Sequence, residues 1–217
     1  MTARKNRAGK PLGRPPATTS AETNQRILDA ARRCFAEFGY DKTTNQRIAD
    51  QAEITTGAIY HYYDSKQQLF AAVADEVNRR VVSEFTDAIV GVETFPEQIT
   101  AILERAMELH RKDRSMAVFS STFPLELRRH PEVTGSIQRE ILLRPQKFFR
   151  AIVKKAHDRG ELRREVDVEA VVTMIASATI GFAYLGAIID DFDAFSAAIR
   201  AFERLVDGDL IVAPAKV

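Results

Sequence analysis

Three short runs of residues with helical periodicity follow one another between residues 20 and 63. In each run apolar side chains recur three or four positions apart, which is the spacing of one face of an α-helix. A Thr–Ser–Ala–Glu capping box opens the first run at Thr19, and Gly39 follows it as a C-terminal stop. We expect the second helix to begin near Thr44 and the third at Thr55. The last two are joined by a tight turn, so the sequence predicts a helix-turn-helix arrangement.

The rest of the chain is also predicted to be helical. No segment shows convincing strand alternation or a repeat, so the predicted fold class is all-α. The later helices are expected from Asp64 or Ser65 toward Val90, from Thr94 to about Lys112, from Ser115 to His130 with an interruption at Pro124, from Pro131 to His157 with a kink at Pro145, after Asp167 through an uncharged stretch, and over Ala194–Val206.

Charge is distributed unevenly along a chain whose net charge is only +1. Residues 1–66 hold 11 Lys and Arg against 7 Asp and Glu, whereas residues 67–217 hold 20 against 23. Residues 1–19 carry five basic residues and no acid, with Gly and Pro throughout, which predicts a disordered basic tail. Within it Gly13-Arg14-Pro15 resembles the core of AT-hook peptides, so Arg14 is a candidate for the minor groove. A basic tail that attracts phosphates without reading bases is the alternative.

The start of the third predicted helix has the properties of a surface that approaches DNA. Apolar residues of the second and third helices brace the pair from inside. Small residues would let the backbone come close to bases, and hydroxyls and amides can bind phosphate. The outward-facing residues are predicted to be Thr55, Thr56, Gly57, Ala58, His61 and Tyr62.

Residues 44–60, TNQRIADQAEITTGAIY, resemble the helix-turn-helix of the TetR/AcrR family of repressors, and the likeness continues through Lys66 to Leu69. Glu53 stands where the family usually has Gly in the turn. A non-glycine residue there must avoid a positive φ or accept about 1–2 kcal/mol of strain.

The resemblance implies an operator-binding homodimer and assigns roles to single residues. Tyr60 and Lys66 would bind the DNA backbone with help from Thr44, while Thr56, Ala58 and Tyr62 would lie closest to the bases. For His61 a DNA contact and a solvent-facing position remain equal alternatives. The implied organisation is a DNA-binding domain over residues 20–66 and a helical ligand-binding and dimerisation domain over residues 67–210.

Two apolar sets in the rear part are candidates for the functions that the resemblance implies. One would line a pocket for a small apolar or amphipathic effector, although a filled core is the alternative; it comprises Met107, Phe119, Phe123, Phe148 and Tyr184. The other would form the dimer interface, unless it belongs to the core of the protomer. Its residues are Ala176, Ala183, Phe195, Ile199, Phe202 and Val206. His110 and His157 are expected at the surface.

Several function classes are disfavoured by the composition. Four His, one Cys, no nucleophile elbow and no Gly-rich phosphate loop give no candidate catalytic, cofactor or metal site. The uncharged stretch Ala170–Ile189 is long enough for a membrane span, but its acidic flanks favour a buried or interface helix. Without an apolar leader the cytoplasm is expected. The predicted function is a ligand-released repressor, and the alternative is a ligand-independent DNA-binding or architectural protein.

Overall fold

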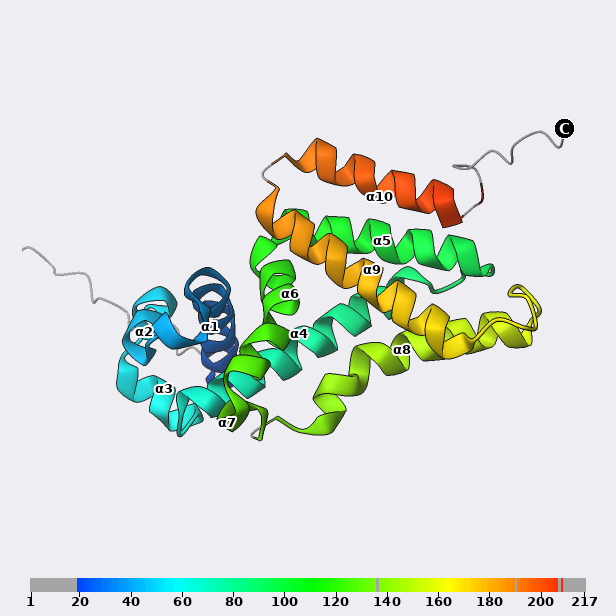
Figure 1. The fold of residues 1–217 in the computed structure, drawn as a ribbon. Helices are drawn as coiled ribbons and strands as arrows, with labels where there is room; N and C mark the ends of the chain where they lie inside the picture. The colour runs from blue at the N-terminus through cyan, green and yellow to red at the C-terminus, as the bar shows by residue number, and fades with distance from the viewer. Residues whose placement is uncertain (1–18, 136, 190, 207, 209–217) are drawn as a thin grey trace, which may run out of the picture.

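The computed structural model describes residues 19–208 apart from 136, 190 and 207. Within this part of the chain every regular element is a helix, which confirms the all-α class. Figure 1 shows α1–α3 gathered at one end, with α4 leading from them toward α5 and α8–α10. The helices are α1 (Ser20–Lys42), α2 (Asn45–Ala52), α3 (Thr56–Tyr62), α4 (Lys66–Ala88), α5 (Phe95–Lys112), α6 (Arg114–Arg129), α7 (Pro131–Thr134), α8 (Arg139–Asp158), α9 (Val168–Ile188) and α10 (Phe192–Val206).

Side-chain caps begin the N-terminal helices where the sequence predicts them. Thr19 and Glu22 form both bonds of the capping box at α1. The hydroxyl of Thr44 accepts from the Arg47 N–H at 3.2 Å, and that of Thr55 accepts from the Ala58 N–H at the same distance. These bonds satisfy backbone donors that have no partner inside the helix, and so they set where α2 and α3 start.

Two buried clusters share helix α4. The first combines α1–α3, the start of α4 and residues of α6 and α7, and the second combines the end of α4 with α5, α8, α9 and α10. Leu69, Phe70 and Val73 belong to the first cluster, and Phe85 belongs to the second. Helix α4 therefore ties the helix-turn-helix to the rear of the molecule through one continuous rod.

The middle helices differ from the prediction at two prolines and at the boundary between α7 and α8. Helix α6 runs through Pro124 without the expected interruption, and α8 runs through Pro145. Proline removes the bond to the carbonyl four residues earlier, which for Pro145 is that of Ile141. The side-chain amide of Asn78 donates to that carbonyl at 3.0 Å and replaces the lost bond. The helix expected from Pro131 to His157 is instead two helices, α7 and α8.

Helix α9 is long and apolar enough to cross a membrane by length and composition, and most of its residues are not buried. It packs against α6 and α8. An apolar helix that is covered on one side and uncovered on the other indicates a surface that meets another molecule.

The turn between α2 and α3 contains the one positive φ at a non-glycine among the described residues. Glu53 has φ 54 and ψ 47, and its N–H donates to the carbonyls of Ala49 and Asp50. Arg26 of α1 donates to the carbonyls of Ala52 and Glu53. Glu53 therefore adopts the left-handed conformation, and the hydrogen bonds from Arg26 of α1 stabilise it.

Relief of this strain should be measurable. Glu53→Gly is expected to raise the free energy of unfolding by about 0.5–1 kcal/mol, because glycine adopts positive φ without a Cβ clash but loses more backbone entropy on folding. Urea unfolding of both proteins, with Glu37→Gly in the α1 helix as a destabilised control, measures the change. A Glu53→Gly protein less stable than the parent would contradict the strain.

Candidate DNA-binding surface and effector cavity

Helix α3 is held from behind and leaves its first turn exposed. Ile59 is fully buried against Ile48 and Ala49 of α2, and the Tyr63 hydroxyl donates to the Asn24 side chain at 2.7 Å. On the other side Gly57, Tyr60 and His61 are exposed, as are Thr44 and Thr55 at the helix starts, while Thr56 and Ala58 are partly exposed. The helix is therefore fixed in orientation, with its N-terminal turn open to a partner.

Gln46 extends this surface and was not identified from the sequence. The Thr56 hydroxyl donates to the Gln46 side-chain oxygen at 2.8 Å, which links the exposed faces of α2 and α3. The Gln46 amide in turn donates to Asp50 at 2.8 Å. A residue at the first turn of α2 carries no motif of its own, so only the folded geometry reveals this bridge.

The structure corrects the role expected of Tyr62. Its hydroxyl lies 3.0 Å from the Ser20 hydroxyl and donates to the Ser20 carbonyl at 3.1 Å, and its ring packs against the first core cluster. The side chain points back to the start of α1 because it lies on the inner side of α3. Tyr62 braces the recognition helix and is not placed to contact bases.

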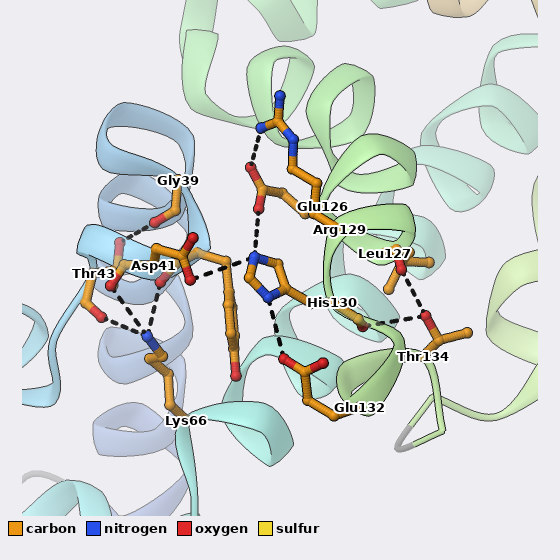
Figure 2. A network of polar contacts seen from close by, with 11 residues as sticks. Gly39, Asp41, Thr43, Lys66, Glu126, Leu127, Arg129, His130, Glu132 and Thr134 are labelled. Atoms are coloured by element: carbon orange, nitrogen blue, oxygen red, sulfur yellow. Dashed lines mark hydrogen bonds and ion pairs between the residues drawn. The ribbon is translucent and has the colours of Figure 1, made fainter.

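Lys66 is likewise engaged inside the protein (Figure 2). Its ammonium donates to the carbonyls of Tyr40 and Thr43 at 2.9 and 3.1 Å, lies 3.5 Å from that of Asp41, and sits over the Tyr40 ring. Gly39, at φ 73, breaks α1 and leaves these carbonyls without helical partners. These bonds engage the ammonium in a link between α1 and α4 that the sequence did not indicate, and the phosphate contact expected of Lys66 stays a prediction. Burial lowers the pKa of Lys66, and Asp41 opposes this.

The tail residue Arg14 lies outside the described residues, as does the predicted basic tail apart from Thr19.

A histidine joins the helix-turn-helix to helices α6 and α7. In Figure 2 Asp41 of α1 lies between Lys66 and the His130 imidazole. His130 Nε2 is 3.4 Å from Asp41 and 3.6 Å from Glu126, and Nδ1 is 3.1 Å from Glu132. Its ring also lies 4.8 Å from the Tyr40 ring. This contact places the end of α6 directly against the end of α1.

A buried arginine makes the corresponding contact at the start of α6. Arg32 of α1 is 1% exposed, and its guanidinium donates to Asp29 at 2.8 Å and to Asp113 at 2.6 Å. Its Nε donates to the Ser115 hydroxyl at 3.0 Å, and Glu76 of α4 lies 3.6 Å away. Burial alone would raise the pKa of Asp113, but the hydrogen bonds from Ser115 and the charge of Arg32 hold this pKa below its usual value.

A cavity of about 440 Å³ lies among helices α4, α5, α6, α8, α9 and α10. Its lining contains no charged side chain, and its five polar residues are Asn78, His110, Ser120, Gln146 and Thr179. Of the predicted pocket residues, Phe123 and Phe148 lie in this lining. The others are corrected: Phe119 packs in the first core cluster beside Phe70, Met107 packs in the second, and Tyr184 is 49% exposed on the outer side of α9.

The residues predicted for the dimer interface face inward. Ala176, Ala183, Phe195 and Ile199 line the cavity, and the Phe202 ring packs on Phe182 at 5.4 Å while Val206 contacts the second core cluster. The exposed apolar side chains of α9 and α10 are instead Met174, Ile180, Tyr184, Leu185, Ile188, Phe192 and Leu205. Helix α9 is apolar on all sides, so its sequence could not show which side faces the protomer core.

His110 is placed in the cavity lining, whereas the sequence indicated the surface. Its Nδ1 is enclosed and has no hydrogen-bond partner. Burial lowers the pKa of His110, and the nearby charge of Arg114 lowers it further. An imidazole on the apolar face of α5 resembles a surface histidine in sequence, and only the packing of α9 over it distinguishes the two.

A helix-turn-helix with an exposed recognition helix, joined to a helical domain with an internal cavity, defines a class: DNA-binding regulators with their own sensor domain. The family model of bacterial regulatory proteins, tetR family, matches residues 27–73, and that of the tetracyclin repressor-like C-terminal domain matches residues 93–191. The chain belongs to the TetR family of transcriptional regulators.

Individual relatives and solved structures agree with this assignment. An HTH-type transcriptional repressor of Mycobacterium tuberculosis is 37% identical over 105 residues, which are 46% of this chain and 56% of that protein. The repressor AcnR of Corynebacterium glutamicum is 29% identical over 74% of this chain and 79% of its own. The structure of FadR from Bacillus subtilis in complex with stearoyl-CoA aligns with a TM-score of 0.70 at 25% identity, covering 85% of this chain and 98% of that one.

Proposed function

We propose that this chain is a cytoplasmic repressor that binds a double-stranded operator as a homodimer and is released by a small apolar or amphipathic effector. One observation carries the proposal: the same chain presents the open first turn of α3 and encloses an uncharged cavity next to helices that contact α1. Two of the similar proteins, that of Mycobacterium tuberculosis and AcnR of Corynebacterium glutamicum, are repressors. Residues 20–66 would bind DNA, and residues 67–210 would bind the effector and form the dimer.

The proposed operator contacts are the residues that remain exposed around α3. Thr56, Gly57 and Ala58 would lie nearest the base edges, because they form the first turn of the recognition helix. Thr44, Thr55, Tyr60 and His61 would reach the DNA backbone. Tyr60 is 54% exposed and has no hydrogen bond to another described residue, which leaves its hydroxyl available for phosphate. Arg14 in the tail would add a minor-groove contact.

The proposed dimer interface is the exposed apolar side of α9 and α10. Met174, Leu185 and Ile188 lie on one side of α9, and they are 57%, 38% and 57% exposed. Leu205 continues the apolar surface on α10 at 44% exposed. Exposed apolar residues gathered on two neighbouring helices are typical of a surface that a second copy covers.

The cavity supports the effector part of the proposal. Its volume lies within the range of small-molecule sites, and its polar groups are few. The similar FadR of Bacillus subtilis was crystallised with stearoyl-CoA, whose long acyl chain is apolar. An apolar group of this kind would fill the cavity of the present protein and would stabilise one arrangement of the helices that surround it.

Three substitutions distinguish the residues proposed to contact DNA from a residue that only supports the recognition helix. Thr56→Ala is expected to change base preference by about 1–3 kcal/mol at one position of each half-site. Tyr60→Phe should weaken all sites alike and lower the salt dependence, because it removes a backbone contact. Tyr62→Phe is the control: it should retain the parent's base preference, since its hydroxyl bonds Ser20.

Selection of bound duplexes from a random pool, followed by titrations at several salt concentrations, measures these effects. Enrichment of short palindromes favours the repressor over an architectural protein, which would coat DNA without sequence preference. A parent protein that enriches no sequence would contradict the proposed function. A change of base preference by Tyr62→Phe alone would contradict the assignment of residues.

The dimer surface has a matched test. Leu185→Glu on α9 should yield monomers and lower operator affinity by at least about a hundredfold, since two half-sites must be bound together. Leu125→Glu places the same charge at a leucine of α6 that is similarly exposed, and it should leave the dimer intact. Sedimentation velocity measures the oligomeric state of each variant. An unchanged dimer for Leu185→Glu would exclude this surface.

A further inference from the structure

The polar side chains of the cavity differ in whether the protein already satisfies them. The Thr179 hydroxyl donates to the Ile175 carbonyl at 2.9 Å, and the Asn78 amide is bonded to the Ile141 carbonyl. Gln146 is exposed at the edge of the lining, and Ser120 is partly exposed. His110 has no hydrogen-bond partner at either ring nitrogen within the described part of the chain, although its Nδ1 is buried. Buried polar groups normally have partners, so this imidazole is the exception that requires an explanation.

The packing around His110 determines which nitrogen a ligand can reach. A Cβ added at Gly186 of α9 would lie 3.1 Å from His110 Cε1 and 3.3 Å from Nδ1. The Phe195 ring lies 5.2 Å from the imidazole. The Nδ1 edge is therefore covered by the backbone of α9, which leaves Nε2 as the reachable nitrogen. An N–H enclosed at Nδ1 would be an unpaired donor, so the proton of the neutral ring belongs on Nε2.

We propose that the effector is a neutral molecule with an apolar body and one oxygen acceptor, a carbonyl or hydroxyl oxygen, which accepts a hydrogen bond from His110 Nε2. The inference rests on the proposed function and specifies the ligand of the same cavity. Ketones, alcohols, lactones, esters and thioesters share this chemistry. A free carboxylate does not, because its charge would enter the cavity with no cation in the lining to pair it.

The distribution of charge supports a neutral ligand. Every Lys and Arg among the described residues lies outside the lining, and Arg111, Lys112 and Arg114, the basic residues that follow His110 in the sequence, are all exposed. Desolvation keeps His110 in its neutral form, which removes the one cation that the lining could supply. An ionised group of a larger effector must therefore remain outside the cavity, with only its neutral part within reach of His110.

The test compares three ligands with a common ten-carbon chain: decanol, methyl decanoate and decanoate. Calorimetric titration of the full-length protein measures each dissociation constant at neutral pH. Decanol and methyl decanoate are expected to bind at least about tenfold tighter than decanoate, because only the carboxylate loses its hydration without compensation. A decanoate affinity equal to or higher than that of the neutral probes overturns the proposal.

Three variants assign the effect to His110. His110→Phe keeps a ring of similar size without the donor and should weaken both neutral probes by about 3- to 10-fold. His110→Gln retains a side-chain N–H donor and should recover part of that loss. His157→Phe is the matched control, because it makes the same change at a partly exposed histidine of α8 outside the lining, and its probe affinities should equal the parent's. Operator binding by each variant reports whether it is folded.

The outcomes separate this proposal from the function on which it rests. Parent-like affinities of His110→Phe for decanol and methyl decanoate overturn the role of His110, and so does an unfolded His110→Phe combined with a His110→Gln that binds no neutral probe. If the parent binds none of the three probes, the ligand class is wrong while operator binding still stands. If the parent binds the probes but selects no operator, the proposed function fails and the ligand site remains.

Discussion

The buried guanidinium of Arg32 is the interaction on which the arrangement of the two parts of the molecule depends. A buried charge is tolerated only when it is fully paired, and Arg32 is bonded to Asp29, Asp113 and Ser115, with Glu76 close by. These partners belong to α1, to α4, to the junction between α5 and α6 and to the first turn of α6. Loss of one partner from such a set typically costs about 3–5 kcal/mol. Helix α1 therefore cannot move relative to α6 without breaking this network, and the recognition helix rests on α1.

Helix α6 contacts helix α1 of the DNA-binding domain and also lines the cavity. Its first cap, Asp113, holds Arg32, and its last residues reach His130, which faces Asp41 at the end of α1. Between these two contacts α6 contributes Met116, Phe123 and other residues to the cavity lining. His110 lies three residues before Asp113 on α5. Under the proposed function, a ligand that shifts α5 or α6 would act on both polar contacts with α1 and through them on the recognition helix.

The sequence predicted the parts of the fold that depend on local signals. Thr44 and Thr55 cap their helices because each hydroxyl accepts from a backbone N–H only three residues later in the chain. Such a bond needs no residue that is distant in the sequence. The roles of Tyr62 and Lys66 could not be predicted in this way, since Ser20 and the broken end of α1 reach them only in the folded chain. The side of α9 that faces the protomer core could not be predicted for another reason. With no charge in α9 after Glu169, periodicity could not distinguish the side that lines the cavity from the side that is exposed.

The most direct test removes the charges of the Arg32 network together and measures the coupling between effector and operator. Arg32→Met with Glu76→Gln and Asp113→Asn removes three of these charges, Asp29 keeps contact with water because its side chain is 30% exposed, and Asn retains the cap of α6. Operator affinity is titrated with and without a saturating neutral probe, such as decanol, in the parent and in the triple variant. We expect the probe to weaken operator binding of the parent at least about fivefold, within the range of allosteric coupling. In the variant, operator and probe should each still bind, but the ratio should fall toward one. A ratio as large as that of the parent would contradict the proposed link between cavity and recognition helix.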